Sequence, residues 1–491
     1  LSANDRYGND ITLYGLRRAL IAVMANFPIY RTYINAKSCR PIDAEYLRLA
    51  VAAALQRHPD MHYELTYIQK FLLMCFDPAT TPEERQHSIK FVMQFQQVTG
   101  PLMAKGVEDT ALYVYNRLIS LNEVGGSPQV FGVTLEEFHD FNRRTVERHP
   151  HAMTATATHD TKRGEDARAR INVLSEIPAE WDQMVKTWRR LNKRRTVRGE
   201  KAPDKNDEYF LYQALLGSWP FDENDLDAFR IRFVEYMIKA VREAKVHTTW
   251  LKHDEEYEAA LTTYVNTILS HKTGAAFLEA FLPFQRKVAW YGMLNSLSQL
   301  LIKLTAPGMP DIYQGTETWD LTMVDPDNRR PVDFAARRDL LRSSRRRAES
   351  DRADFIRDLT DAMPNGRIKL FVMHEALSAR QRWESVFRDG DYIPLTAEGL
   401  RADNIIAFMR RHGDHHLMTV VPRFCTELVG ENELPVGPSV WDDTSIKMPR
   451  PGLGRWHNVL TRREVRGDGQ VAVADILARF PVALLVPEEE E

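Results

Sequence analysis

The chain has 491 residues, of which 44% are hydrophobic and 27% are charged, and its formal net charge is −3. Because this length exceeds one ordinary hydrophobic core, we expect roughly two to four domains. The composition excludes a disordered chain, and the charge gives no electrostatic reason to expect a nucleic acid as partner. No apolar run approaches the ~18 residues of a membrane span, so no membrane partner is expected.

The three cysteines, Cys39, Cys75 and Cys425, are far apart in the sequence and lack the spacing of a zinc site. An odd number of scattered cysteines favours reduced thiols in a cytoplasmic protein. No other group of residues has the spacing of metal ligands, and we expect no metal and no cofactor.

The first predicted domain, residues 1–95, is a helical segment. Apolar residues recur at helical spacing over 13–27, behind a possible capping residue at Asp10, and again over 44–56 and 82–97. Aromatic residues on such faces belong to a hydrophobic core far more often than to a ligand site.

The second predicted domain, residues 96–165, begins with a charged group beside a glycine, formed by Lys105, Glu108 and Asp109. A helix is expected over 110–121, and acidic residues are favoured in the first turn of a helix. The spacing alone therefore favours a helix start over a substrate-binding role, and both interpretations stay open.

The same domain ends in a predicted buried strand. Threonine alternates with alanine over 154–158, after an amphipathic helix expected at 135–148. Charged residues follow the strand: His159, Asp160, Lys162, Arg163, Glu165 and Asp166. Buried charges are costly without a role, and α/β enzymes carry their chemistry at the C-terminal ends of strands. We therefore expect a functional site at this strand end.

Residues 166–279 are predicted to form a helical insertion packed beside that site. Its basic cluster, Arg189–Arg195, is interpreted as a solvated helix face, because neighbouring acidic residues offset the charge. Residues 280–367 then return to an α/β pattern, with a long apolar helix over 281–304 and a strand over 311–313.

The loop around this last strand carries polar and aromatic candidates for substrate binding: Asp311, Tyr313, Gln314, Glu317 and Trp319. Such groups suit a sugar site, because polar atoms pair with hydroxyls and an indole can stack on a pyranose ring. Turn chemistry accounts for the loop equally well. The final domain, 368–491, has short alternating runs between turns and is predicted to be all-β.

Three strings of this sequence resemble the maltooligosyl trehalose synthase family, within glycoside hydrolase family 13, the α-amylase superfamily. They are Gly100-Pro-Leu-Met-Ala-Lys-Gly-Val-Glu-Asp-Thr110, Ala157-Thr-His-Asp-Thr-Lys-Arg-Gly-Glu-Asp166 and Ala306-Pro-Gly-Met-Pro-Asp-Ile-Tyr-Gln-Gly-Thr-Glu317. Shorter similar strings at 25–33, 207–217 and 325–330 extend the resemblance over essentially the whole chain.

The resemblance implies a partial (β/α)8 barrel with large helical insertions and a C-terminal all-β domain. It implies an isomerase that acts on maltooligosaccharides by intramolecular transglycosylation. The reducing-end α-1,4 bond is broken and the same glucose is rejoined through an α,α-1,1 bond. A retaining mechanism of this kind needs two carboxyl groups about 5–5.5 Å apart across the anomeric carbon.

The resemblance also implies roles for individual residues. Asp160 matches the third carboxylate, which stabilises the oxocarbenium-like transition state, and His159 matches a ligand of the sugar hydroxyls. Lys162 and Arg163 fall within the same string and are expected to line the reducing-end side of the site.

The strings that carry the nucleophile and the general acid in this family are not found in this sequence. We therefore expect the chain to be the C-terminal portion of such an enzyme, inactive alone, with the missing N-terminal part of the same polypeptide as a possible partner. Half a barrel would expose strand edges, so self-association is expected. Two alternatives stay open: an amylase-like α-glucan hydrolase, and a non-catalytic glucan-binding or assembly fragment.

Overall fold

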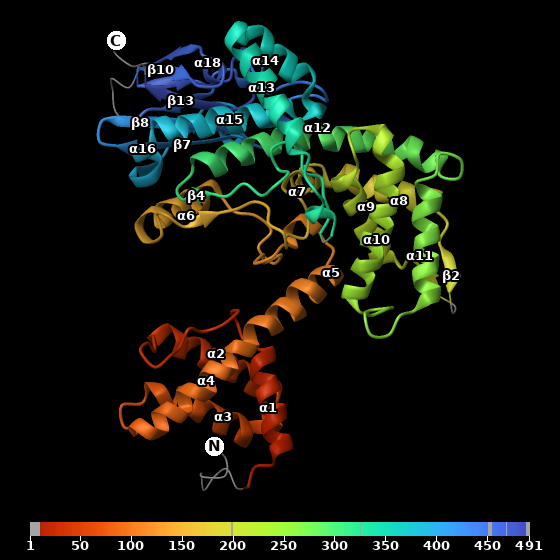
Figure 1. The fold of residues 1–491 in the computed structure, drawn as a ribbon, viewed down its shortest axis with the longest axis vertical. Coiled ribbons are helices and arrows are strands. Elements are labelled where there is room, and N and C mark those ends of the chain that lie inside the picture. Colours follow the sequence, from red (N-terminus) through yellow and green to blue (C-terminus); the bar gives the residue numbers. More distant parts are fainter. Residues whose placement is uncertain (1–9, 198–199, 325, 450–453, 468, 488–491) are drawn as a thin grey trace. The chain divides into compact units, whose positions relative to one another are not determined.

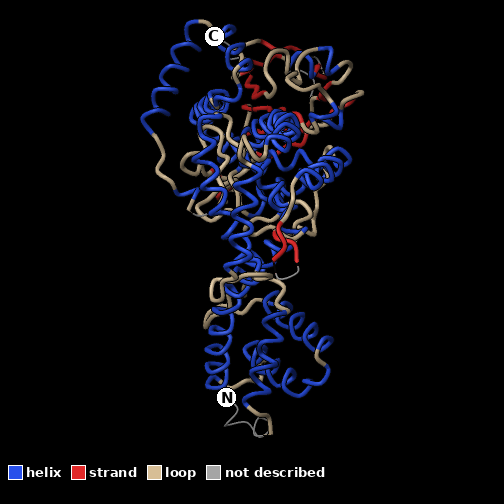
Figure 2. Tube along the Cα trace, turned by 90° about the vertical axis from the view of Figure 1, so that its right-hand side faces the viewer, coloured by secondary structure: helices blue, strands red, loops and turns tan. Residues whose placement is uncertain are grey.

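The computed structural model describes residues 10–197, 200–324, 326–449, 454–467 and 469–487. The chain forms two compact units, Leu1–Val114 and Tyr115–Glu491, which are described separately (Figures 1 and 2). The outermost residues of the predicted domains 1–95 and 368–491 lie outside the described part of the chain. Among the described residues, no helix is long and apolar enough to cross a membrane.

The first unit is built from helices, as predicted. They are α1 (Leu13–Ala25), α2 (Pro41–Arg57), α3 (His62–Leu73) and α4 (Pro82–Met103), with one-turn 3-10 helices η2 (Pro59–Met61) and η3 (Met74–Phe76). Their apolar faces meet in one core that includes Val23, Leu47 and Leu65. The cap of α1 is Thr12 rather than Asp10, because the Thr12 Oγ1 atom accepts the backbone N–H of Gly15 at 3.0 Å.

The prediction of one helix over 110–121 is wrong. Instead, α4 continues through a π-helical segment, η4 (Ala104–Ala111), and ends in α5 (Leu112–Val114). A separate 3-10 turn, η5 (Ile119–Leu121), begins the second unit. The pattern misled because α4 contains Pro101, a residue that normally interrupts a helix, so the acidic residues beyond it looked like a new helix start.

The first α-helix of the second unit is α6 (Leu135–Arg148), whose bounds match the prediction. The region predicted as a helical insertion contains helices and one short hairpin. These elements are α7 (Glu165–Asn172), η6 (Val173–Ser175), α8 (Pro178–Leu191), β2 (Arg195–Val197), β3 (Glu200–Ala202), α9 (Lys205–Ser218), η7 (Glu223–Asp225), α10 (Leu226–Ala244) and α11 (Glu255–Ile268).

The long apolar helix predicted at 281–304 is present as α12 (Ala275–Thr305). It contacts α7, α8, α15 and β8, so it joins the helical insertion to the C-terminal part of the unit (Figure 1). Close packing against α7 occurs at Gly292, where a Cβ atom would lie only 2.5 Å from the Cγ atom of Arg170. Only glycine fits there without a shift.

The C-terminal part begins with helices and ends in two antiparallel sheets. The helices are α13 (Phe334–Ser350), α14 (Arg352–Asp361), η9 (Met363–Asn365), α15 (Arg367–Arg382) and α16 (Glu384–Asp389). The six-stranded sheet has the order β11 (Glu464–Arg466), β10 (Arg455–Asn458), β13 (Ala483–Pro487), β8 (His415–Pro422), β7 (Ile405–His412), β5 (Asp391–Pro394). The three-stranded sheet has the order β12 (Gln470–Ala472), β9 (Ser445–Lys447), β6 (Ala397–Glu398).

Strands in this part begin at Asp391 and not at 368, where the sequence placed the start of the β domain. The run Ile368–Met373 has strand-like composition but belongs to α15, because its apolar side chains are buried in a helix that packs on α12. Short helices α17 (Pro438–Trp441) and α18 (Val473–Ile476) and 3-10 turns η10 (Ala402–Asn404) and η11 (Cys425–Glu427) connect the strands, which Figure 2 shows in red.

The parallel β structure of the described residues is a single pair of two-residue strands, β1 (Met153–Thr154) and β4 (Met309–Pro310). The predicted buried strand is therefore shorter than expected, and Met153 is 75% exposed. The strand predicted at 311–313 lies two residues earlier. The sequence pattern could not fix these bounds, because a strand exists only where a partner pairs with it. The (β/α)8 barrel stays a prediction.

Candidate functional site

The predicted strand is followed by a tight turn, Thr158–Thr161, called the strand-end turn below, which exposes two side chains. Beyond β1, the Thr158 Oγ1 atom accepts the backbone N–H groups of Asp160 and Thr161, both at 3.2 Å. The Thr161 hydroxyl donates back to the Thr158 carbonyl at 3.0 Å. Threonine side chains favour such local turns over a continuing strand. The turn leaves the side chains of His159 and Asp160 exposed.

A second loop supports this turn from a distant part of the sequence. It contains the 3-10 turn η8 (Asp327–Arg329). The buried Asn328 Nδ2 atom donates to the carbonyls of Thr158 and His159, both at 3.3 Å. The Arg329 Nε atom donates to the His159 carbonyl at 3.1 Å, and its Nη2 atom lies 4.0 Å from the Asp160 Oδ1 atom. The turn is therefore fixed through its backbone, and its two functional candidates stay accessible.

Lys162 and Arg163 lie on the inner side of the same segment. Lys162 is 4% exposed, and its backbone N–H donates to the Glu123 Oε1 atom at 2.6 Å. The Arg163 guanidinium is buried and donates through Nη1 to the carbonyls of Ile119 at 3.0 Å and Asn122 at 3.2 Å. The structure thus separates Arg163 from the exposed His159–Asp160 turn and gives its guanidinium backbone partners in the interior.

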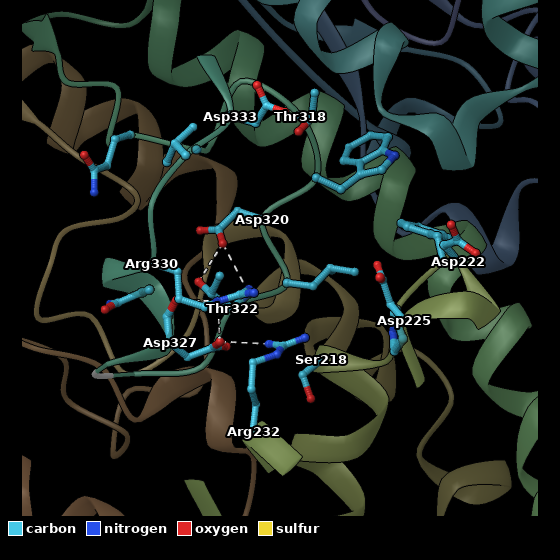
Figure 3. A pocket seen from close by; sticks show the side chains of 18 of the residues that line it. Ser218, Asp222, Asp225, Arg232, Thr318, Asp320, Thr322, Asp327, Arg330 and Asp333 are labelled. Atoms are coloured by element: carbon cyan, nitrogen blue, oxygen red, sulfur yellow. Dashed lines mark hydrogen bonds and ion pairs between the residues drawn. The ribbon is translucent and has the colours of Figure 1, made fainter. Parts of the chain in front are cut away.

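A polar pocket of about 390 Å³ lies beside the loop that follows β4 (Figure 3). Three of the predicted sugar ligands, Tyr313, Gln314 and Trp319, line it. The Tyr313 hydroxyl donates to the Asn328 carbonyl at 3.1 Å, so the pocket wall and the support of the strand-end turn share one residue. The charged residues of the lining are Asp222, Asp225, Arg232, Asp320, Asp327, Arg330, Asp333 and Arg337.

Two further candidates from this loop do not line the pocket. The Glu317 Oε2 atom accepts the Arg337 Nε–H at 2.9 Å and the Gly315 backbone N–H at 3.1 Å, which supports the pocket wall from behind. The Asp311 backbone N–H donates to the Thr154 carbonyl at 2.8 Å and extends the β1–β4 pairing by one bond.

Ion pairs and hydrogen bonds order the floor of the pocket. The Asp327 Oδ1 atom lies 2.8 Å from both the Arg232 Nη1 atom and the Arg330 Nε atom. The Asp320 carboxylate accepts the Thr322 hydroxyl at 2.6 Å, and burial raises the pKa of Asp320 (Figure 3). Fixed carboxylates and guanidinium groups around the indole of Trp319 can pair with several hydroxyl groups of a saccharide.

Lys105, Glu108 and Asp109 belong to the first unit, on the π-helical segment η4. The Lys105 Nζ atom lies 2.5 Å from the Asp109 Oδ2 atom, and the buried Glu108 carboxylate accepts a hydrogen bond from the Tyr30 hydroxyl. π-helical segments are rare and occur often at functional sites, and the substrate-binding interpretation of these three residues stays a prediction.

Sequence reasoning missed a buried ionic cluster behind the strand-end turn, formed by Glu165, Asp166, Lys303 and Lys369. Glu165 and Asp166 are the last two residues of the string Ala157–Asp166, which resembles the synthase family. The sequence signal that could have revealed the cluster is the position of the two lysines, because Lys303 and Lys369 interrupt the apolar runs 300–304 and 368–373. A lysine in a buried apolar stripe usually has a carboxylate partner.

One group of potential metal ligands occurs among the described residues, where ligand atoms of Asp204, Asp207 and His247 lie within 4.8 Å of one another. The ligand atoms already have hydrogen-bonding partners in the protein. The His247 Nε2 atom lies 2.9 Å from the Asp204 Oδ2 atom, and the Tyr257 hydroxyl donates to the Asp207 Oδ2 atom at 2.5 Å. We assign no cation to this group.

No protein-family model matches the chain. Two curated proteins from Mycobacterium tuberculosis strains CDC 1551 and H37Rv, both called putative maltooligosyl trehalose synthase, are 34% identical to it over 394 residues. The match covers 80% of this chain and 45% of each relative.

Solved structures give the same result. The maltooligosyltrehalose synthase from Arthrobacter ramosus superimposes with a TM-score of 0.79 at 34% identity, covering 96% of this chain and 54% of that chain. A hypothetical maltooligosyl trehalose synthase from Sulfolobus tokodaii gives 0.66 at 30% identity, with coverage of 96% and 53%. The chain spans about half the length of the relatives it matches. The resemblance to the maltooligosyl trehalose synthases is thus confirmed over most of this chain.

Proposed function

We propose that this chain is part of a glucan mutase that converts the reducing-end α-1,4 linkage of maltooligosaccharides to an α,α-1,1 linkage. The observation that carries the proposal is the strand-end turn. Within the string Ala157–Asp166, only His159 and Asp160 are exposed, and the backbone hydrogen bonds of the turn hold them in place. An exposed carboxylate on a fixed backbone is suited to a substrate rather than to the fold.

In this proposal Asp160 is the carboxylate that stabilises the positive charge of an oxocarbenium-like transition state in a retaining mechanism. His159 donates a hydrogen bond to a sugar hydroxyl. Strands β1 and β4 are two strands of an α-amylase-type barrel, within the predicted barrel segments 96–165 and 280–367. The predicted helical insertions 1–95 and 166–279 precede these segments in the sequence. No residue of this chain is assigned as nucleophile or general acid, so we propose that the chain alone does not turn over substrate.

The pocket of Figure 3 is proposed as part of the saccharide-binding surface. The Trp319 indole is fixed by its Nε1–H, which donates to the Met363 carbonyl at 2.8 Å, and it can stack on a pyranose ring. Tyr313 and Gln314 supply hydrogen-bonding groups at the rim. Lys162, Arg163, Glu317 and Asp311 are proposed as supports of this surface. Separately, Lys105, Glu108 and Asp109 of the first unit are proposed as substrate-binding residues.

The test supplies this chain with a polypeptide covering the remaining part of a curated relative and follows the products from maltopentaose. A falling count of reducing ends indicates capping as trehalose, whereas a rising count indicates the alternative, an amylase-like hydrolase. Asp160→Asn should lower turnover on the order of 10³-fold, equivalent to about 4 kcal/mol of transition-state stabilisation. Asp414→Asn, at an exposed carboxylate in the β7–β8 turn, is the matched control.

Turnover of Asp160→Asn within tenfold of wild type would show that the assigned role is wrong. Calorimetric titration of the chain alone with maltopentaose separates the second alternative. Heat of binding with no turnover in either arrangement indicates a non-catalytic glucan-binding fragment.

A further inference from the structure

Four charged side chains are buried together behind the strand-end turn. The Lys369 Nζ atom on α15 lies 2.7 Å from the Glu165 Oε1 atom and 2.6 Å from the Asp166 Oδ2 atom, both at the start of α7. The Lys303 Nζ atom on α12 lies 3.2 Å from the Glu165 Oε2 atom. The Lys369 side chain is fully buried, and those of the other three are at most 3% exposed.

Glu165 connects this cluster to the strand-end turn. The Thr156 hydroxyl donates to the Glu165 carboxylate and accepts a hydrogen bond from Lys303 Nζ at 2.8 Å. The Arg168 guanidinium donates to the Thr156 carbonyl. Thr156 lies between β1 and the His159–Asp160 turn, so Glu165 fixes the chain that leads into the turn.

Asp166 connects the cluster to the wall of the pocket. The Asp166 Oδ2 atom accepts the backbone N–H of Asp320 at 2.5 Å, and Lys369 Nζ donates to the Thr318 carbonyl at 3.2 Å. The Lys369 Nζ atom also lies 6.0 Å from the centre of the Trp319 ring. At Gly164, a Cβ atom would lie 2.5 Å from the Asp320 carbonyl oxygen, so segment 318–322 is packed directly on the start of α7.

The charges of the cluster depend on one another. Burial would raise the pKa of Glu165, but the charges of Lys369 and Lys303 outweigh burial and lower it to about 2. Burial raises the pKa of Asp166 to about 6, against the attraction of Lys369. Both carboxylates therefore rely on Lys369, and its removal would leave two buried acids without their shared cation.

We propose that Lys369 is a positioning residue that couples the strand-end turn to the pocket wall, through Glu165 on one side and Asp166 on the other. The proposal rests on the proposed function as far as substrate turnover is concerned, because only that function gives the turn and the pocket a common substrate. The coupling of the two backbone segments rests only on the contacts of Lys369, Glu165 and Asp166.

The test compares Lys369→Met, Glu165→Gln and Asp166→Asn by hydrogen exchange of two backbone segments, 155–163 and 313–323. Glu165→Gln should speed exchange on the order of tenfold in 155–163 only, and Asp166→Asn in 313–323 only, because each removes one charged contact and lowers the local opening free energy. Lys369→Met should speed exchange in both segments.

Arg352→Met is the matched control. It breaks another largely buried ion pair, with 2.6 Å between the Arg352 Nη2 and Glu375 Oε2 atoms, that contacts neither segment. It should leave exchange in both segments unchanged. If Lys369→Met does not fold, Lys369→Arg replaces it: this variant keeps the charge but displaces the donor from both carboxylates, and it should also speed exchange in both segments.

The kinetic readout uses the chain together with the remaining part of a relative. Glu165→Gln should lower kcat more than it changes KM, and Asp166→Asn should raise KM more than it lowers kcat. A structural role alone would change both constants together in each variant.

The coupling is overturned if Lys369→Met speeds exchange in only one segment or in neither, or if Arg352→Met reproduces its pattern. Absence of turnover in wild type would count against the proposed function alone. The exchange pattern would still support or overturn the coupling.

Discussion

Asp160 and Glu165 lie five residues apart in one string, yet their surroundings are opposite. The Asp160 side chain is 60% exposed, and the Arg329 Nη2 atom lies 4.0 Å from its Oδ1 atom. The Glu165 side chain is 2% exposed and contacts two lysines and a threonine hydroxyl. The turn keeps its carboxylate available by using backbone hydrogen bonds, whereas the cluster uses its carboxylates to hold the fold. Charge in a recognised motif therefore has two separate roles, and burial distinguishes them.

The largest expected effect is on the buried side of this comparison. Lys369→Met should lower the free energy of unfolding by about 3–5 kcal/mol, because breaking a buried ion pair leaves uncompensated charge. Chemical denaturation of the chain measures this loss. Lys186→Met, at an exposed pair with Asp182, should change stability by less than about 0.5 kcal/mol. Similar losses in the two variants would remove the distinction.

A second buried carboxylate extends the comparison to pH. Burial first, and then Asp204, raises the pKa of Asp207 to about 6. The native carboxyl holds its proton more tightly than an unfolded one with a pKa of about 3.9, so its stabilising contribution is complete below that pH and is lost as the pH rises to about 6.

Asp207→Asn keeps an acceptor for the Tyr257 hydroxyl but does not titrate. Wild type should therefore lose up to about 3 kcal/mol relative to Asp207→Asn between pH 4 and 7, measured by denaturation at each pH. Asp414→Asn, at an exposed carboxylate, is the reference variant measured in parallel. A flat difference between wild type and Asp207→Asn would contradict the expected proton uptake.

A smaller effect is expected between the two regions, at Asn328. Asn328→Ala removes the donor to the Thr158 and His159 carbonyls and should cost about 1–2 kcal/mol of stability. It should also loosen the strand-end turn, which hydrogen exchange over 157–163 would report. Asn224→Ala, at an exposed residue of the 3-10 turn η7, serves as the reference. An unchanged exchange rate in the turn would show that Asn328 does not support it.

The smallest stability effect is expected on the exposed side. Asp160→Asn should change the free energy of unfolding by no more than about 0.5 kcal/mol, because surface substitutions without buried partners rarely do more. The same variant is expected to lose most turnover. A stability loss as large as that of Lys369→Met would mean that Asp160 belongs with the structural carboxylates.

Local patterns predicted most helices and the antiparallel strands near the C-terminus, such as β7 and β8, but not the bounds of the parallel strands. The helices α6 and α12 were predictable because apolar spacing within one helix determines them. The strand β1 was not, because its partner β4 lies about 150 residues later and pairs with only two residues. The all-β domain was predicted to start at 368, but the run Ile368–Met373 lies in α15, which packs against α12.

The residues of the candidate site also fall into those that local sequence could predict and those that it could not. The motif supplied His159 and Asp160, and the loop composition supplied Tyr313, Gln314 and Trp319, because these residue types carry the chemistry themselves. Lys369 stands out because it interrupts an apolar run, but local sequence could not identify its partner Asp166, which is 203 positions away. Arg163 was placed on the substrate side because its neighbours in the string suggested it, and the fold turns its guanidinium inward.

The helix α12 has a consequence for how the second unit unfolds. Its 31 residues span about 46 Å at 1.5 Å per residue. Near one end, Phe277 and Phe281 pack on Trp188 of the helical insertion. Near the other, the Ser298 hydroxyl donates to the Pro422 carbonyl at the end of β8. The helical insertion and the terminal sheet therefore both pack on α12, so neither can lose its core without partly unfolding this helix. We expect the two regions to unfold in a single calorimetric transition.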